Sequence, residues 1–119
     1  MRRYCWWLMV MLVFYPLSGE ARPGPNGYMV LGPGGMSCAH WTKVRRDEVL
    51  STPVVTWVMG FVASYNRYGP GSPDITQGRN ADGIPGWIDN YRAQNPLNNI
   101  ADAAENLVNT LLVRDVAPQ

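Results

Sequence analysis

The sequence predicts an all-α protein: a small bundle of three to four helices that follows a cleaved signal peptide. Apolar residues recur at three- and four-residue steps over residues 97–112, which is the period of an amphipathic helix. Residues 52–65 are apolar around almost the whole circumference, as expected of the central helix of a small bundle. Prolines and glycines gather in residues 22–37 and 69–86 and leave helix-compatible stretches between them.

Residues 1–21 have the pattern of a secretory signal peptide. A pair of arginines forms the positive n-region, residues 4–17 form a mostly apolar h-region, and small residues lead to Ala21, after which we expect cleavage. A membrane anchor is the competing interpretation, but a spanning helix needs roughly 20 apolar residues, and this run is shorter and contains Pro16. We therefore expect a periplasmic or secreted protein whose mature chain has no membrane span.

The expected mature chain, residues 22–119, is electrically neutral. The whole sequence has ten basic and nine acidic residues, and loss of Arg2, Arg3 and Glu20 leaves eight of each. Nucleic-acid binding rewards a basic face through counterion release, so the composition argues against such a partner. The length is that of one domain, which we place at residues 38–114 before a short tail at 115–119.

Residues 22–37 surround one short apolar run, residues 28–31, with prolines and glycines. Because the prolines break any helix, we predict a flexible arm that lays this run on the domain. A phosphate-binding loop is excluded, since no Gly-Lys-Ser/Thr sequence follows and no strand precedes the glycines.

Two helices are predicted after this arm. Ser37 is placed to cap a helix over residues 38–49. Thr52-Pro53 joins a capping hydroxyl to a proline at the first helical position, which predicts a second helix over residues 52–65. Gly60 costs about 1 kcal/mol in a helix relative to alanine, so we expect it to permit close packing against a neighbour.

Cys38 is left alone in the mature chain, because Cys5 leaves with the signal peptide. Two roles are open for it: a small buried apolar residue, or a candidate intermolecular thiol that forms a disulfide with another chain. Catalysis with His40 is disfavoured, since side chains two residues apart point about 200° apart on a helix. These two residues also give too few ligands for zinc.

The predicted loop over residues 69–86 is long for a compact domain, and such loops are functional or mobile by default. Asp74, Arg79 and Asp82 are its charged residues, and we take them as a candidate partner-binding set. The two aspartates can also be imagined as a catalytic pair or calcium ligands. The spacing of a calcium loop is absent, however, and cap or turn roles account for both.

A short helix with Trp87, Ile88 and Tyr91 on its apolar side is predicted next, with Asp89 in its first turn. Asn95-Pro96 then repeats the capping pattern and predicts a last helix over residues 96–113. Its expected apolar stripe is Leu97, Ile100, Ala101, Ala104, Leu107, Val108, Leu111 and Leu112.

Four segments together resemble a known type of protein. They are Cys38 with Trp41, Trp57-Val58-Met59-Gly60-Phe61, the Trp-Ile-Asp-Asn-Tyr sequence at 87–91, and Ala103-Ala104-Glu105-Asn106-Leu107-Val108. Over residues 38–112 the chain is similar to small exported bacterial proteins grouped near the HdeA-type acid-stress chaperones and the Rap1a-type immunity proteins. The resemblance implies a helical periplasmic protein in which a cysteine directly after residue 91 bridges to the first helix. Here that position is Arg92, so the resemblance implies that Cys38 lacks its partner.

Two non-enzymatic functions are expected. The first is a small periplasmic interaction protein, immunity-like in the sense of the resemblance or otherwise, that binds a protein partner through its loop or an exposed aromatic residue. The second is an acid-stress chaperone of the HdeA type, which needs carboxylates whose protonation destabilises the fold. Eight acidic residues balanced by eight basic ones make a weak acid trigger and favour the first function. The sequence predicts no cofactor and leaves the oligomeric state open.

Overall fold

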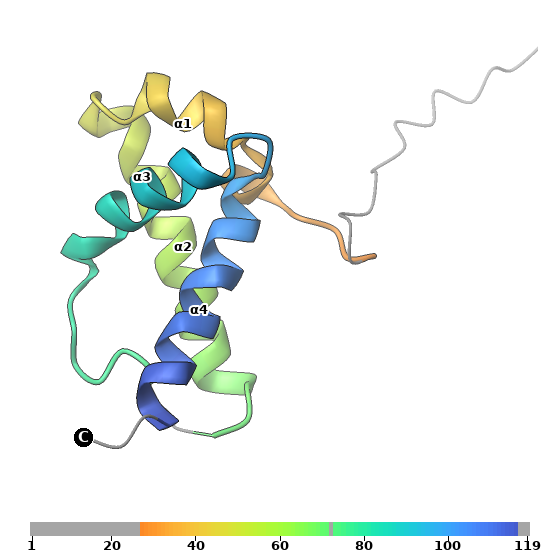
Figure 1. The fold of residues 1–119 in the computed structure, drawn as a ribbon, viewed down its shortest axis with the longest axis vertical. Helices are drawn as coiled ribbons and strands as arrows, with labels where there is room; N and C mark the ends of the chain where they lie inside the picture. The colour runs from red at the N-terminus through yellow and green to blue at the C-terminus, as the bar shows by residue number, and fades with distance from the viewer. Residues whose placement is uncertain (1–26, 72, 117–119) are drawn as a thin grey trace, which may run out of the picture.

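The computed structural model describes residues 27–71 and 73–116, and in this part of the chain it confirms the all-α class with four α-helices and no strand. α2 (Glu48–Tyr68) and α4 (Ile100–Val116) lie side by side and finish at the same end of the molecule (Figure 1). α1 (Cys38–Val44) lies across their opposite end, and α3 (Ile84–Gln94) crosses in front of both. Two short 3-10 turns are η1 (Gly32–Gly35) and η2 (Ala81–Gly83). The predicted signal peptide, residues 1–21, and the adjoining residues 22–26 lie outside the described residues.

The core lies where the four helices meet, and α4 supplies the largest share. Its predicted stripe is confirmed from Ile100 to Leu111 but not at Leu97, which is 96% exposed because it precedes the helix. α2 contacts α1, α3, α4 and η1, as expected of a central helix, yet only one side of it is fully buried. The main members of the core cluster are Trp41, Val54, Val58, Val62, Ile75, Ile88, Ile100, Ala104, Leu107, Val108 and Leu111.

α1 is shorter than predicted, and α2 is longer. Ser37 caps α1 as predicted, since its hydroxyl oxygen accepts a hydrogen bond from a backbone N–H of the first turn. The Asp47 carboxylate then accepts from two backbone N–H groups at the start of α2. α2 therefore begins at Glu48 rather than at residue 52, and Pro53 lies inside the helix. The role expected for Gly60 is also wrong, because the space beside its Cα is open.

α4 begins at Ile100 rather than at residue 96. Asn95 ends α3 instead, where its backbone N–H donates to the Tyr91 carbonyl at 2.9 Å. Asn99 and Asp102 make a reciprocal capping pair: Asn99 Oδ1 accepts from the Asp102 N–H at 2.9 Å, and Asp102 Oδ2 accepts from the Asn99 N–H at 3.0 Å. Two otherwise unpaired backbone donors are satisfied in this way, which fixes the start of the helix.

Part of the predicted arm packs into the fold through its glycines. η1 lies against Trp57 of α2, whose indole N–H donates to the Leu31 carbonyl at 2.8 Å. A side chain at Gly34 would overlap the Trp57 ring, so the close approach requires glycine there. The expectation that the apolar run docks on the domain is wrong for Met29 and Leu31, which are exposed.

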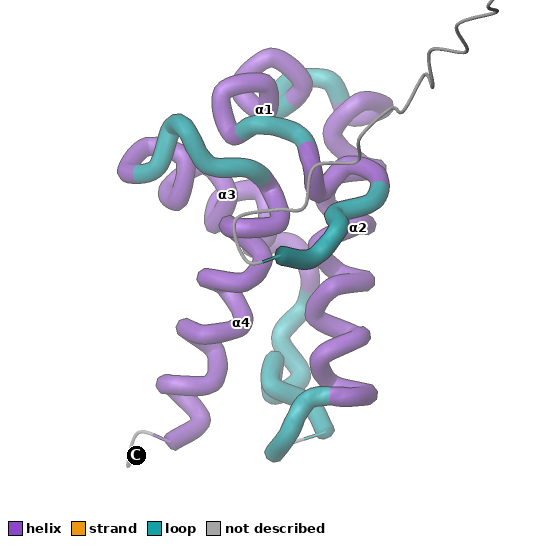
Figure 2. Tube along the Cα trace, turned by 90° about the vertical axis from the view of Figure 1, so that its right-hand side faces the viewer, coloured by secondary structure: helices purple, strands orange, loops and turns teal. Residues whose placement is uncertain are grey.

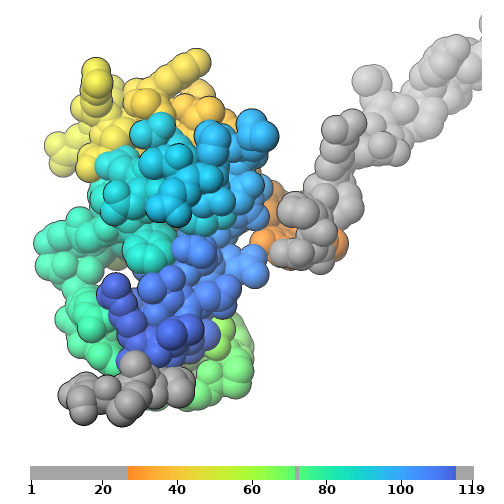
Figure 3. Space-filling view, viewed as in Figure 1, coloured from red at the N-terminus to blue at the C-terminus, as the bar shows by residue number. Residues whose placement is uncertain are grey.

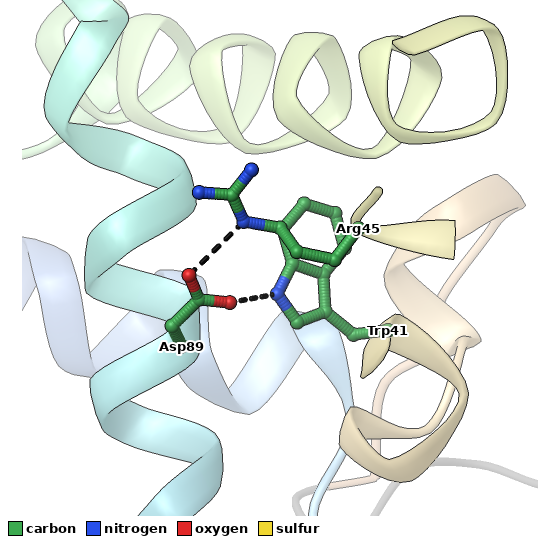
Figure 4. A network of polar contacts seen from close by, with 3 residues as sticks. All are labelled: Trp41, Arg45 and Asp89. Atoms are coloured by element: carbon green, nitrogen blue, oxygen red, sulfur yellow. Dashed lines mark hydrogen bonds and ion pairs between the residues drawn. The ribbon is translucent and has the colours of Figure 1, made fainter. Parts of the chain in front are cut away.

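The carboxylate of Asp89 joins α1 to α3 (Figure 4). Asp89 Oδ1 accepts from Trp41 Nε1 at 2.7 Å, and Oδ2 accepts from Arg45 Nε at 3.0 Å. Trp41 is 0% exposed, so its indole N–H depends on this acceptor. The position predicted for Asp89, in the first turn of a helix, is wrong, because α3 begins at Ile84 and Asp89 lies in its second turn.

A short stretch of backbone pairing fixes the start of α1 to the start of α4. The Cys38 N–H donates to the Asn98 carbonyl at 2.8 Å, and the Ile100 N–H donates to the Met36 carbonyl at 2.9 Å. The turn between α3 and α4 is therefore held at the same end of the molecule as α1.

Candidate functional site

The segment predicted as a loop over residues 69–86 is shorter in the structure, because η2 and the first turn of α3 occupy its end. Residues 69–71 follow the C-terminal end of α2, and residues 73–80 run back along the molecule toward α3 (Figure 1). Ile75 anchors this loop: its side chain is 1% exposed within the core, and its N–H donates to Asn66 Oδ1 at 3.1 Å. The loop is therefore held against the helices.

Asp74 organises the turn that follows. Its carboxylate accepts from the Thr76 N–H and the Gly78 N–H, each at 2.9 Å, and from the Thr76 hydroxyl. These hydrogen bonds, that of the Thr76 hydroxyl first, stabilise the ionised form and lower the pKa of Asp74. Gln77 and Gly78 take the left-handed backbone conformation of the tight turn, with φ of 53° and 75°. The turn role predicted for Asp74 agrees with this geometry.

Asp82 has a similar local role at η2. Its carboxylate Oδ2 accepts from Asn80 Nδ2 at 2.7 Å, and its backbone N–H donates to Asn80 Oδ1 at 3.3 Å. Of the three predicted loop residues, Asp74 and Asp82 therefore bond within their own turns. Arg79, which lies between them, is the one that faces the cavity described next.

A cavity of about 350 Å³ lies between this loop, α3 and the C-terminal halves of α2 and α4. α2 and α4 diverge toward their C-terminal ends (Figure 2), and Thr76, Arg79 and Asn80 of the loop line the cavity. Figure 3 shows the loop, in green to teal, beside the blue C-terminal part of α4. The apolar walls are Met59, Val62, Ala63, Ile84, Trp87, Leu107 and Leu111.

Two arginines are the charged residues that line this cavity: Arg79 from the loop and Arg114 from the last turn of α4. Both side chains are exposed, and neither makes an ion pair or a side-chain hydrogen bond with a described residue. No aspartate or glutamate stands among the described lining residues. The cavity therefore combines apolar walls with positive charge that no described lining residue compensates.

Trp87 forms part of the wall, and its indole Nε1 is buried without a hydrogen-bond partner in the described part of the chain. The indole N–H groups of Trp41 and Trp57, in contrast, donate to Asp89 and to the Leu31 carbonyl. A buried donor without an acceptor costs about 1–3 kcal/mol.

The sequence identified Arg79 but not the other walls of the cavity. A clue was present in residues 52–65, where apolar side chains cover more of the helix than one packed face can bury. Met59, 44% exposed, and Ala63 belong to this excess and face the cavity. Arg114 carried no such clue, because an arginine at the end of a helix is also explained by the helix dipole.

Cys38 does not line the cavity. It is 0% exposed at the start of α1 and is a free thiol, and its Sγ donates to the Asn99 carbonyl at 3.5 Å. Burial, and then the charge of Asp102, raise the pKa of the Cys38 thiol, whereas the Arg92 guanidinium lowers it. This environment favours the role of a buried apolar residue, since an intermolecular disulfide would require the start of α1 to open. His40 is exposed.

Within residues 27–71 and 73–116, no group of three or more His, Cys, Asp or Glu side chains is placed to hold a metal ion. In the same residues, no helix is both long and apolar enough to cross a membrane. Comparison of the chain with models of protein families, with curated proteins and with solved structures finds no match.

Proposed function

We propose that this protein is a small exported, non-enzymatic interaction protein that binds a protein partner at the cavity between its loop and α2, α3 and α4. The observation that carries the proposal is an apolar cavity flanked by Arg79 and Arg114, which have no counter-charge among the described residues. Apolar walls favour association by burying apolar surface, and a few placed polar groups fix specificity.

The loop beside the cavity is preorganised, which supports a recognition role. Ile75 is buried in the core, and Asp74 closes the turn that follows it. An anchored loop loses little conformational freedom when a partner binds, so less of the contact energy is spent on ordering it. Loops held on a fixed helical scaffold are common recognition sites.

The polar side chains around the cavity support binding rather than catalysis. Those among the described lining residues are arginines, asparagines, threonines and the indole N–H. General acid–base catalysis needs a titratable group near the working pH, and nucleophilic catalysis needs a nucleophile beside a base. We therefore propose a site that recognises and does not transform its partner, with no cofactor.

Capture of the partner by matched variants tests the proposal. Ala63→Leu enlarges a side chain on the cavity wall, whereas Ala39→Leu makes the same change at an exposed position of α1 outside it. The parent and both variants serve as bait in a periplasmic extract of the source organism, and retained proteins are identified by mass spectrometry. Retention of one partner by the parent and Ala39→Leu, with loss in Ala63→Leu, is expected. Equal retention by all three, or no specific partner of the parent, contradicts the proposal.

Export is tested separately with the full chain expressed in a Gram-negative host. Cleavage after Ala21 predicts a mature protein in the periplasmic fraction whose mass corresponds to residues 22–119. An unprocessed chain retained in the cytoplasm would show that residues 1–21 are not a signal peptide.

An acid-stress chaperone of the HdeA type is the second candidate. The observation that favours it is that Asp74 and Asp89 each hold more than one donor group of the fold. Protonation of the Asp74 carboxylate at low pH would weaken its hydrogen bonds and loosen the loop. Circular dichroism and size-exclusion chromatography at pH 7 and pH 2.5 discriminate, because a chain that stays folded and monomeric in acid cannot act by exposing its core.

A further inference from the structure

We infer that the cavity binds the C-terminal end of the partner chain, with an apolar last residue between α2 and α4 and its terminal carboxylate on Arg79 and Arg114. The inference rests on the proposed function and names the part of the partner that the site recognises. Three features of the cavity support the inference: its charge, its volume and its polar groups.

The charge of the cavity selects an anionic ligand. Both charged residues that line it are arginines, one from the loop and one from α4. A guanidinium presents several N–H donors in a planar fork that matches a carboxylate. Because these donors have no partner among the described residues, a carboxylate gains charge-assisted hydrogen bonds without displacing an internal ion pair.

The volume limits the apolar part of the ligand. About 350 Å³ lies near the lower end of the roughly 300–1,000 Å³ typical of ligand pockets. Such a space accepts one or two side chains rather than the face of a whole helix. Met59 on its wall is unbranched and adapts to side chains of different shape, which suits an apolar chain end.

A peptide end fits the polar groups of the wall better than a free fatty acid does. Besides the arginines, polar side chains come from α2, the loop and α4, namely Asn66, Thr76, Asn80 and Thr110. A fatty acid carries oxygen atoms at one end only. A peptide end carries its carboxylate and also carbonyl and N–H groups along the chain, so it can serve several wall groups together.

An internal segment of a partner fits less well than a chain end. Such a segment would have to enter the cavity and leave it again, yet the loop residues Thr76, Arg79 and Asn80 form part of its lining. A chain end needs only one way in. Its terminal carboxylate also adds a negative charge that an apolar internal segment lacks.

The indole N–H resonances of the full chain provide a direct measurement. In proton–nitrogen correlation spectra the Trp87 signal reports on the cavity wall, and the signal of Trp41, bonded to Asp89, is an internal control. The probes are an N-acetylated hexapeptide that ends in two leucines with a free carboxylate, the same peptide with a C-terminal amide, and decanoate. We expect the free acid to shift the Trp87 signal and to bind about tenfold or more tightly than the amide, because the amide loses charge-assisted hydrogen bonds.

Arginine variants locate the carboxylate. Arg79→Gln and Arg114→Gln should each weaken binding of the free acid by about tenfold and reduce its preference over the amide. Arg46→Gln is the matched control, since Arg46 is exposed in the turn between α1 and α2 and does not line the cavity. An unmoved Trp41 signal in each variant shows that the fold is retained.

Three results would overturn the inference: equal affinity for acid and amide, decanoate binding as tightly as the peptide acid, or no Trp87 shift with any probe. These are distinct from failure of the proposed function. A captured partner that depends on the cavity, and still binds after removal of its own C-terminal residues, sustains the proposed function and overturns this inference.

Discussion

Replacing Asp89 with alanine removes the carboxylate that joins α1 to α3. Two donors lose their acceptor in this variant: Trp41 Nε1, at 2.7 Å, and Arg45 Nε, at 3.0 Å. The two losses differ in kind, because water reaches one donor and not the other. The total loss of stability therefore depends mostly on the indole N–H of Trp41.

The buried donor sets the magnitude. Trp41 is 0% exposed, so its N–H is left without a partner, which costs about 1–3 kcal/mol. The side chains of Arg45 and Asp89 are 41% and 37% exposed, and such an ion pair contributes about 0–1 kcal/mol. We expect Asp89→Ala to lower the free energy of unfolding by about 2–3 kcal/mol, or the melting temperature by roughly 8–20 °C for a domain of this size.

Two control variants separate the contributions. Asp89→Asn retains a carbonyl oxygen for the indole N–H but loses the charge, and Arg45→Gln removes only the exposed partner. Each should cost no more than about 1 kcal/mol. Urea titrations followed by circular dichroism at 222 nm measure all three variants, and an unchanged m-value shows that the free energies are comparable. If Asp89→Ala and Asp89→Asn agree within about 0.5 kcal/mol, the indole does not depend on the carboxylate and the reasoning is refuted.

Three further predictions follow from the fold. Ile100→Ala should cost about 2–5 kcal/mol in urea titrations because this side chain is fully buried, whereas Leu97→Ala, at a 96% exposed position, should change stability by less than about 0.5 kcal/mol. Gly34→Ala should destabilise the protein by about 1–3 kcal/mol, since the new methyl group overlaps the tryptophan ring of α2, and Gly35→Ala, which faces open space, should leave the thermal melt unchanged. The lowered pKa of Asp74 means that its carboxylate stabilises the fold above about pH 4 and loses that effect as the pH falls through the lowered value. Asp74→Asn should therefore be less stable than the parent at pH 7, and the difference in urea midpoint should shrink toward pH 2.

Periodicity was sufficient to predict the helical class and most of the buried stripe of α4. Every stripe residue from Ile100 to Leu111 is buried, because a run of three- and four-residue steps allows one packed face. The same pattern did not show at which residue of the stripe the helix begins. Leu97 continues the spacing but lies in the turn before α4.

The errors at the starts of α2 and α4 have one physical origin. Thr52-Pro53 and Asn95-Pro96 each join a capping side chain to proline, a pattern that favours a helix start but also fits other places. In the structure Thr52-Pro53 lies inside α2, and Asn95-Pro96 lies in the turn that ends α3. Better caps stand nearby: Asp47 accepts from two backbone N–H groups, and Asn99 exchanges hydrogen bonds with Asp102. Asp47 and the Asn99–Asp102 pair each satisfy two backbone N–H groups, and this favours them over Thr52 and Asn95 as caps.

The cavity could not be predicted from the sequence, because its shape depends on the angle between the helices. Its walls come from α2, the loop, α3 and α4, which are far apart along the chain. Ile75 helps to set that geometry, since it inserts from the loop into the core between the helices. The sequence could predict a long loop with Arg79 in it, but not that Arg114 would face the same space.

The helices are joined differently at the two ends of the fold. At one end α1, the turn before α4 and the Asp89 contact to Trp41 are joined by backbone pairing and a buried hydrogen bond. At the other end α2 and α4 diverge around the cavity (Figure 2), and the loop forms part of its lining. The N–H groups of Cys38 and Ile100 donate across this backbone pairing, so their amide exchange should be slow. Arg92, whose charge acts on the thiol of Cys38, belongs to the well-joined end. A disulfide between these two positions would thus reinforce the end that is already held together, and its absence leaves the cavity and its arginines unaffected.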